Sequence, residues 1–98
     1  MVKIRFSSAL RGITKTNEKI LEVDNTTLKY VLDKLTEEFG DDFRNRLIDK
    51  GEIRRFINIY INGEDIRHLK GIDSHVTNND EISILPAVSG GGIWYIYF

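Results

Sequence analysis

The sequence predicts an α+β fold in which a mixed sheet of 4-5 strands packs on one main helix. Three observations support this prediction. Apolar and polar residues alternate near the start and the end of the chain, five apolar residues between them recur at helical spacing, and Asn62-Gly63 marks a tight hairpin turn. The predicted order of elements is therefore hairpin, helix, strand, short strand, strand.

The chain begins with a predicted hairpin. Its first strand is Val2–Phe6, in which apolar and polar residues alternate as in a strand with one buried face. The partner strand is Lys19–Val23, after a polar connection through Gly12 and Asn17.

An amphipathic helix follows, because the apolar period changes from two to about 3.6 residues. The apolar stripe consists of Leu28, Val31, Leu32, Leu35 and Phe39. Asp24, Asn25 or Thr26 is expected to cap its first free N–H groups, and Gly40 to end it in a left-handed conformation.

Residues Asp41 to Arg54 form a charged insertion between this helix and the next strand. Its large apolar residues before Ile53 are Phe43, Leu47 and Ile48. We predict a solvated surface excursion that contains at most one short helix.

Phe56 to Ile61 is the most clearly predicted strand, and it leads into Asn62-Gly63, a dipeptide that favours a type I′ turn. Glu64–Arg67 returns from that turn. After a second turn at 78–80, Glu81–Leu85 forms the last strand, which Pro86 stops because proline has no N–H to donate.

The alternation of side chains predicts an apolar patch on the face of the sheet away from the helix. If the isoleucines of the strand at 56–61 face the helix, Phe56 and Tyr60 face the other way, and Leu85 joins them. Such a patch would be a docking surface for a partner enzyme. The alternative is that the insertion or the C-terminal residues fold over it.

A glycine-rich tail follows the last strand. Leu85 to Gly92 includes three consecutive glycines, and a glycine backbone fits into a slot too narrow for other residues. Extended from Pro86 to Gly91, this tail would reach about 20 Å, enough to enter a partner's active site. The alternative is an idle, frayed terminus.

The last six residues, Ile93 to Phe98, are all apolar or aromatic. This composition is typical of an aggregation-prone strand, so the segment should not stay exposed to water. Either it pairs as an edge strand, or it is removed to free a glycine carboxylate. We favour removal, since activation by ATP needs a free carboxylate and an internal glycine has only an amide carbonyl.

Composition excludes several classes of function. The 98 residues make one domain, and a net charge of −1 gives no electrostatic basis for binding nucleic acid. The absence of cysteine excludes thiol catalysis and cysteine metal sites, and His68 and His75 have no neighbours at ligand spacing, so no metal site is predicted. Neither a signal peptide nor a membrane span is expected, which predicts a cytoplasmic protein.

These residues together resemble a known family. Ile61-Asn62-Gly63-Glu64, followed after a short loop by the run from Asn79 to Gly91, is similar to the C-terminal half of the MoaD/ThiS family of ubiquitin-like sulfur carriers. The resemblance covers residues 1 to 91 and implies a ubiquitin-like β-grasp fold. It divides the chain into a β-grasp domain (1–89), a diglycine tail (90–91) and an extension (92–98) that a peptidase would remove.

The resemblance also implies a function. The reactive residue would be Gly91, with Gly90 beside it in the slot of an adenylating enzyme that uses ATP. The chain itself would bind no cofactor and would be a carrier, not an enzyme. The resulting thiocarboxylate would donate sulfur to an acceptor enzyme that makes molybdopterin, thiamin or thiolated tRNA. Alternatives are a protein modifier joined through Gly91 to lysines of target proteins, as in archaeal relatives, and a binding module whose extension is structural.

Overall fold

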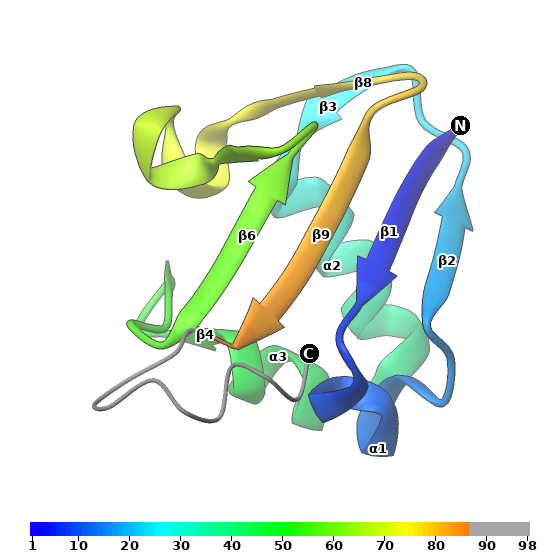
Figure 1. Cartoon of the computed structure of the whole chain (residues 1–98), viewed down its shortest axis with the longest axis vertical. Helices are drawn as coiled ribbons and strands as arrows, with labels where there is room; N and C mark the ends of the chain where they lie inside the picture. Colours follow the sequence, from blue (N-terminus) through cyan, green and yellow to red (C-terminus); the bar gives the residue numbers. More distant parts are fainter. Residues whose placement is uncertain (87–98) are drawn as a thin grey trace.

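The computed structural model describes residues 1–86, which form one mixed five-stranded sheet with a long helix across one face (Figure 1). The elements in chain order are β1 (Val2–Phe6), η1 (Ser8–Leu10), α1 (Arg11–Thr14), β2 (Glu18–Leu21), β3 (Asn25–Thr27), α2 (Leu28–Phe39), α3 (Asp41–Leu47), β4 (Ile48–Asp49), β5 (Glu52–Ile53), β6 (Ile57–Ile61), β7 (Glu64–Asp65), η2 (Ile66–His68), η3 (Gly71–Asp73), β8 (His75–Thr77) and β9 (Glu81–Pro86).

The sheet has the strand order β2-β1-β9-β6-β7. Its two central strands, β1 and β9, are parallel, while the β1–β2, β6–β9 and β6–β7 pairs are antiparallel. With α2 packed across it, this is the ubiquitin-like β-grasp arrangement, so the predicted fold class and element order are confirmed.

The core lies between α2 and the inward face of the sheet. Alternate residues of β1, β6 and β9 are buried on that face: Val2, Ile4, Phe6, Ile57, Ile59, Ile61, Ile82 and Ile84. The predicted helical stripe meets them, and Leu32 and Leu35 are at most 1% exposed. The alternation in the strands and the helical period therefore identified the two surfaces that form the core.

The ends of α2 differ in detail from the prediction. Its N-cap is Thr27, whose hydroxyl accepts a hydrogen bond from the Tyr30 N–H, and not Asp24, Asn25 or Thr26. Asn25 and Thr26 belong with Thr27 to β3, which pairs with β8 in a separate two-stranded ribbon, and the helix begins directly after the last residue of this strand. Gly40 ends the helix at a positive φ of 91°, but its ψ of −179° lies outside the left-handed helical region.

The connection between β1 and β2 is more ordered than predicted. It contains η1 and α1, and Leu10 at their junction is fully buried. The partner strand β2 ends at Leu21, two residues earlier than predicted, and Val23 packs against the core from outside the strand.

The prediction that residues 41–54 form a solvated surface excursion is wrong. The segment forms α3 and the β4–β5 hairpin, and Phe43 and Leu47 are fully buried. The Phe43 ring centroid lies 5.4 Å from that of Phe39 and 6.1 Å from that of Phe6. The insertion therefore closes one end of the core, because its few apolar residues cluster on one side of α3.

The turn after β6 is of the predicted kind, since Asn62 and Gly63 both have positive φ, 53° and 85°. The return strand β7 is shorter than predicted and passes into η2 at Ile66. Pro86 belongs to β9 as its last residue, opposite Ile57, so the strand runs one residue further than predicted. Within residues 1–86, no helix is long and apolar enough to cross a membrane.

Candidate functional site

The candidate site is the face of the sheet that α2 leaves uncovered, at the end where β9 finishes. In Figure 1 this is the near face, and β9 ends beside α3 and β4. The predicted reactive residues Gly90 and Gly91, together with residues 92–98, lie outside the described residues. What the structure describes is the surface from which that tail continues.

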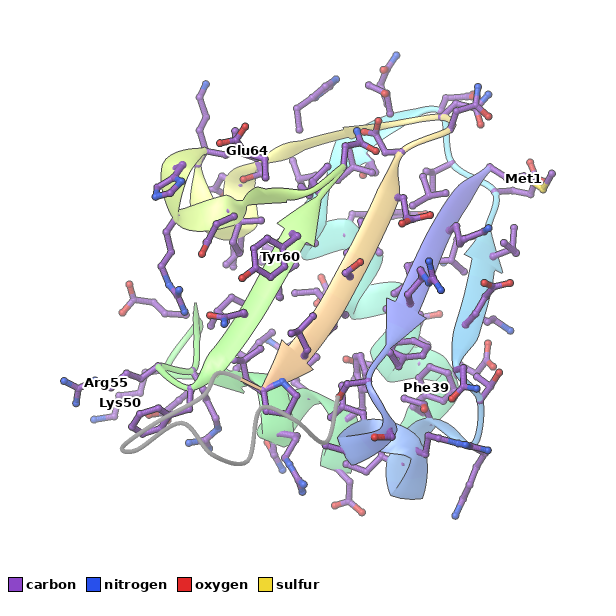
Figure 2. All side chains as sticks on the ribbon, in the orientation of Figure 1. Met1, Phe39, Lys50, Arg55, Tyr60 and Glu64 are labelled. Atoms are coloured by element: carbon purple, nitrogen blue, oxygen red, sulfur yellow. The ribbon has the colours of Figure 1, made fainter. Side chains whose placement is uncertain are left out.

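Tyr60 and Leu85 lie on this uncovered face, as predicted. Tyr60 is opposite Ser83 and Asn58 is opposite Leu85, so Tyr60 and Leu85 are diagonal neighbours across the β6–β9 pair. Figure 2 shows Tyr60 on the near face of β6. Both side chains are only partly exposed, so the patch is less exposed than predicted.

Phe56 is placed differently from the prediction. It lies in the turn before β6, so the strand alternation does not apply to it. The side chain is 57% exposed, and the Arg55 guanidinium lies 5.9 Å from the centre of its ring. Phe56 therefore adjoins the Tyr60–Leu85 pair at the end of β9 instead of lying in the same row.

Two polar residues lie beside the apolar ones on this face. Ser7 Oγ and Asn58 Oδ1 are buried, and neither has a hydrogen-bond partner among the described residues. Ser7 and Leu85 line the same hollow of about 190 Å³. Asn58 lies on the neighbouring strand β6, directly opposite Leu85. Alternation predicts both residues on this face, and the structure adds that their side-chain oxygens are buried without a described partner.

Charged residues flank the patch on its β2 side. The Arg5 guanidinium lies 3.9 Å from the Glu81 carboxylate, and the Lys3 ammonium 4.0 Å from that of Glu18. These exposed pairs contribute little stability. They form a polar rim around an apolar centre, which is the usual anatomy of a docking surface.

A hydrogen-bonded turn fixes the start of β9. Asp80 Oδ2 accepts from the Thr77 N–H at 2.8 Å and from the Thr77 hydroxyl, while Oδ1 accepts from the Asn62 side chain. Burial acts to raise the pKa of the Asp80 carboxyl, but these hydrogen bonds, helped by the charge of His75, outweigh it and lower that pKa below its ordinary value.

The described residues offer no assembled catalytic or metal-binding group. No set of three or more histidine, aspartate or glutamate side chains within residues 1–86 is placed to hold a metal ion. His68 and His75 are both exposed and lie on different elements.

Known proteins are similar to this chain over most of its length. The model of the ThiS family matches residues 4–91. A putative sulfur carrier protein of Archaeoglobus fulgidus is 32% identical over 92 residues, covering 92% of this chain and 98% of that protein. Small archaeal modifier protein 3 of Haloferax volcanii is 31% identical, with the same two coverages.

Among solved structures, a chain of the BexX/CysO complex of Amycolatopsis orientalis superimposes with a TM-score of 0.83 at 29% identity. The match covers 93% of this chain and all of that one, 100%. The resemblance inferred from the hairpin and the glycine tail is therefore confirmed over nearly the whole chain.

Proposed function

The chain belongs to the ThiS family of ubiquitin-like sulfur carriers, and on that premise we propose that its Gly91 carboxylate is the reactive group. Proteolytic removal of residues 92–98 frees this carboxylate. A partner enzyme then adenylates it with ATP, and a sulfur nucleophile converts it to a thiocarboxylate.

The observation that carries this proposal is where the family match ends. It runs from residue 4 to residue 91, so its last position is Gly91, and the seven residues Gly92 to Phe98 lie beyond it. If this position is the C-terminus of a carrier, Gly91 has a free carboxylate here only after the extension is removed. This supports cleavage after Gly91 in preference to Gly92.

The chemistry needs little from the chain besides position. The Gly91 carboxylate attacks the α-phosphorus of ATP, forms an acyl adenylate and releases pyrophosphate. Hydrosulfide attacks the acyl carbon and displaces AMP, which leaves the carbonyl as a thiocarboxylate. The chain is therefore a substrate, and the partner enzyme supplies the catalysis.

The uncovered face would bring the tail to that enzyme. Tyr60 and Leu85 supply the apolar contact, and Phe56 extends it to the end of β9. The similar structure from Amycolatopsis orientalis, which is a two-protein complex, supports a docking role.

A second candidate function is protein modification through Gly91. It is favoured by the similarity to small archaeal modifier protein 3 over 92% of this chain. The two functions share cleavage and adenylation and differ in the nucleophile that captures the adenylate, which is sulfur in one and a lysine of a target protein in the other. One protein can serve both functions.

The intact mass of the protein isolated from its own cells tests the proposal. A mass that ends at Gly91, with one carboxylate oxygen replaced by sulfur, is the expected result for the carrier. Larger adducts joined to lysines would identify the modifier. A single full-length mass that retains residues 92–98, under conditions in which the pathway is active, would contradict both.

A further inference from the structure

A groove of about 420 Å³ lies at the end of β9, next to the uncovered face. Most of its wall comes from the insertion and from the turn before β6. Its lining residues are Arg46, Asp49, Arg54, Arg55, Phe56, Ile57 and Pro86. Since Pro86 is the last residue of β9, the groove adjoins the point from which the tail continues.

Three arginines and one aspartate line this groove, although the whole chain has a net charge of −1. Within residues 1–86, none of these three arginines pairs with a carboxylate. By contrast, Arg44 on the other side of α3 lies 3.0 Å from Asp33. The groove therefore concentrates positive charge that its described neighbours do not neutralise.

Two of these arginines make contacts that fix their orientation but do not neutralise their charge. Arg54 Nε donates to the Asn45 carbonyl at 2.7 Å, which fixes that side chain against α3. The Arg55 guanidinium lies over the exposed Phe56 ring. Figure 2 shows Arg55 and Lys50 projecting from the end of the molecule where β6 begins. An oriented arginine beside an exposed aromatic ring is typical of the residues that dominate binding energy in interfaces.

We propose that this arginine groove binds an acidic segment of the partner that docks on the uncovered face, through bidentate contacts between guanidinium groups and Asp or Glu carboxylates. The inference rests on the proposed function for the identity of the partner, which is the adenylating enzyme. It adds a property of the partner enzyme: a cluster of carboxylates at the entrance to the slot that receives the glycines.

The distance to Gly91 favours protein carboxylates over the phosphates of ATP as the occupant. An extended tail from Pro86 to Gly91 would reach about 20 Å. The nucleotide reacts at that far end, whereas the groove lies at the near end. The groove therefore faces the part of the partner's surface that surrounds the slot.

The first test uses the full-length chain with hexaglutamate as the probe, titrated into the isotope-labelled protein and followed by NMR. The largest amide shifts are expected at Arg46, Arg55 and Phe56. The Arg46→Glu/Arg55→Glu variant should abolish them, and neither side chain makes a described hydrogen bond whose loss would disturb the fold. The control, Arg11→Glu/Lys34→Glu, carries the same change in charge outside the groove and should retain them.

The second test measures affinity for the adenylating enzyme of the same organism, with the full chain and with a chain that ends at Gly91. The groove variant should bind roughly tenfold more weakly than the control, with a reduced dependence on salt, because charge complementarity steers association.

Equal affinity of the groove variant and the control for the enzyme would overturn the proposal, as would hexaglutamate shifts centred elsewhere. Loss of self-association in the groove variant, with no change in either binding, would make a second copy of the chain the occupant and also overturn it. If the unaltered chain that ends at Gly91 supports no exchange, the proposed function fails, whereas the hexaglutamate titration still decides whether the groove binds carboxylates.

Discussion

Asn62 Nδ2 lies 2.9 Å from Asp80 Oδ1, which joins the turn after β6 to the residue that precedes β9. The oxygen of the same amide accepts a hydrogen bond from the Glu81 N–H at 2.9 Å. One asparagine therefore sets the register between β6 and β9, the two strands that carry Tyr60 and Leu85. This contact therefore couples the type I′ turn to the uncovered face of the sheet.

The first prediction concerns Asp80 and pH. Replacing Asp80 with Ala should lower the free energy of unfolding at pH 7 by about 1 to 2 kcal/mol, because the donors of Thr77 and Asn62 lose their acceptor. The folded-state pKa of Asp80 is lowered, so its contribution is complete above the ordinary Asp value of about 3.9 and is lost as pH falls through the lower, folded-state value.

Urea titrations between pH 7 and pH 3 measure this effect. The difference between wild type and Asp80→Ala should stay constant down to about pH 5 and shrink below about pH 4. Asp24→Ala is the control, since its side chain makes no described hydrogen bond. A difference that grows as the pH falls would contradict the assignment.

The second prediction concerns the helix. Leu32→Ala or Leu35→Ala should cost about 2 to 5 kcal/mol of unfolding free energy, since both side chains are buried against the sheet. Lys34→Ala, on the exposed side of the same helix, should change it by less than about 0.5 kcal/mol. Denaturant titration of the three variants checks this. A cost below about 0.5 kcal/mol for both leucine variants would mean that α2 does not pack as described.

The third prediction concerns the insertion. Phe43→Ala should cost about 3 to 5 kcal/mol, because the ring is fully buried between Phe6 and Phe39. Arg46→Ala, one turn further along α3 and exposed, is the matched control. Thermal and chemical unfolding compare the two. If Phe43→Ala unfolds like the wild type, the insertion is the surface excursion that its composition suggested.

The insertion shows where sequence analysis fell short. Alternation identified the strands, and the stripe from Leu28 to Phe39 identified α2, because both patterns repeat often enough to be distinctive. Residues 41–54 contain too few apolar residues to show a period. Their burial depends on a gap at the end of the sheet that exists only once β1 and α2 have packed together, and local sequence does not encode that gap.

The candidate site was predictable to a similar degree. Alternation placed Tyr60 and Leu85 on the same face, and the turn chemistry of Asn62-Gly63 placed the hairpin beside it. Phe56 is exposed as predicted, but it lies in a turn before the strand, so alternation does not determine which way it faces. The arginine groove combines α3, the β4–β5 hairpin and the end of β9, so no single segment of the sequence reveals it.

The fourth prediction concerns docking. Tyr60→Ala or Leu85→Ala should weaken binding to the adenylating enzyme by roughly 1 to 2 kcal/mol each, the size expected for apolar anchors at an interface. Stability should change much less, since both side chains are partly exposed. Ile20→Ala is the control, because Ile20 is 42% exposed on the same face but lies on the edge strand β2.

Calorimetric titration and thermal melts separate the two effects. Unchanged affinity combined with a large loss of stability would show that Tyr60 and Leu85 serve the fold and not the interface. An equal loss of affinity in Ile20→Ala would move the docking surface toward β2.

ATP–pyrophosphate exchange tests the central claim, activation of the Gly91 carboxylate, most directly. The assay compares the chain that ends at Gly91, the full-length chain and a Gly91→Trp variant of the shortened chain, each with the adenylating enzyme of the same organism. We expect exchange with the first alone, because the full-length chain has an amide at Gly91 and tryptophan cannot enter the glycine slot. Equal exchange with the shortened and full-length chains would contradict removal of residues 92–98, and no exchange with any of them would contradict activation at Gly91.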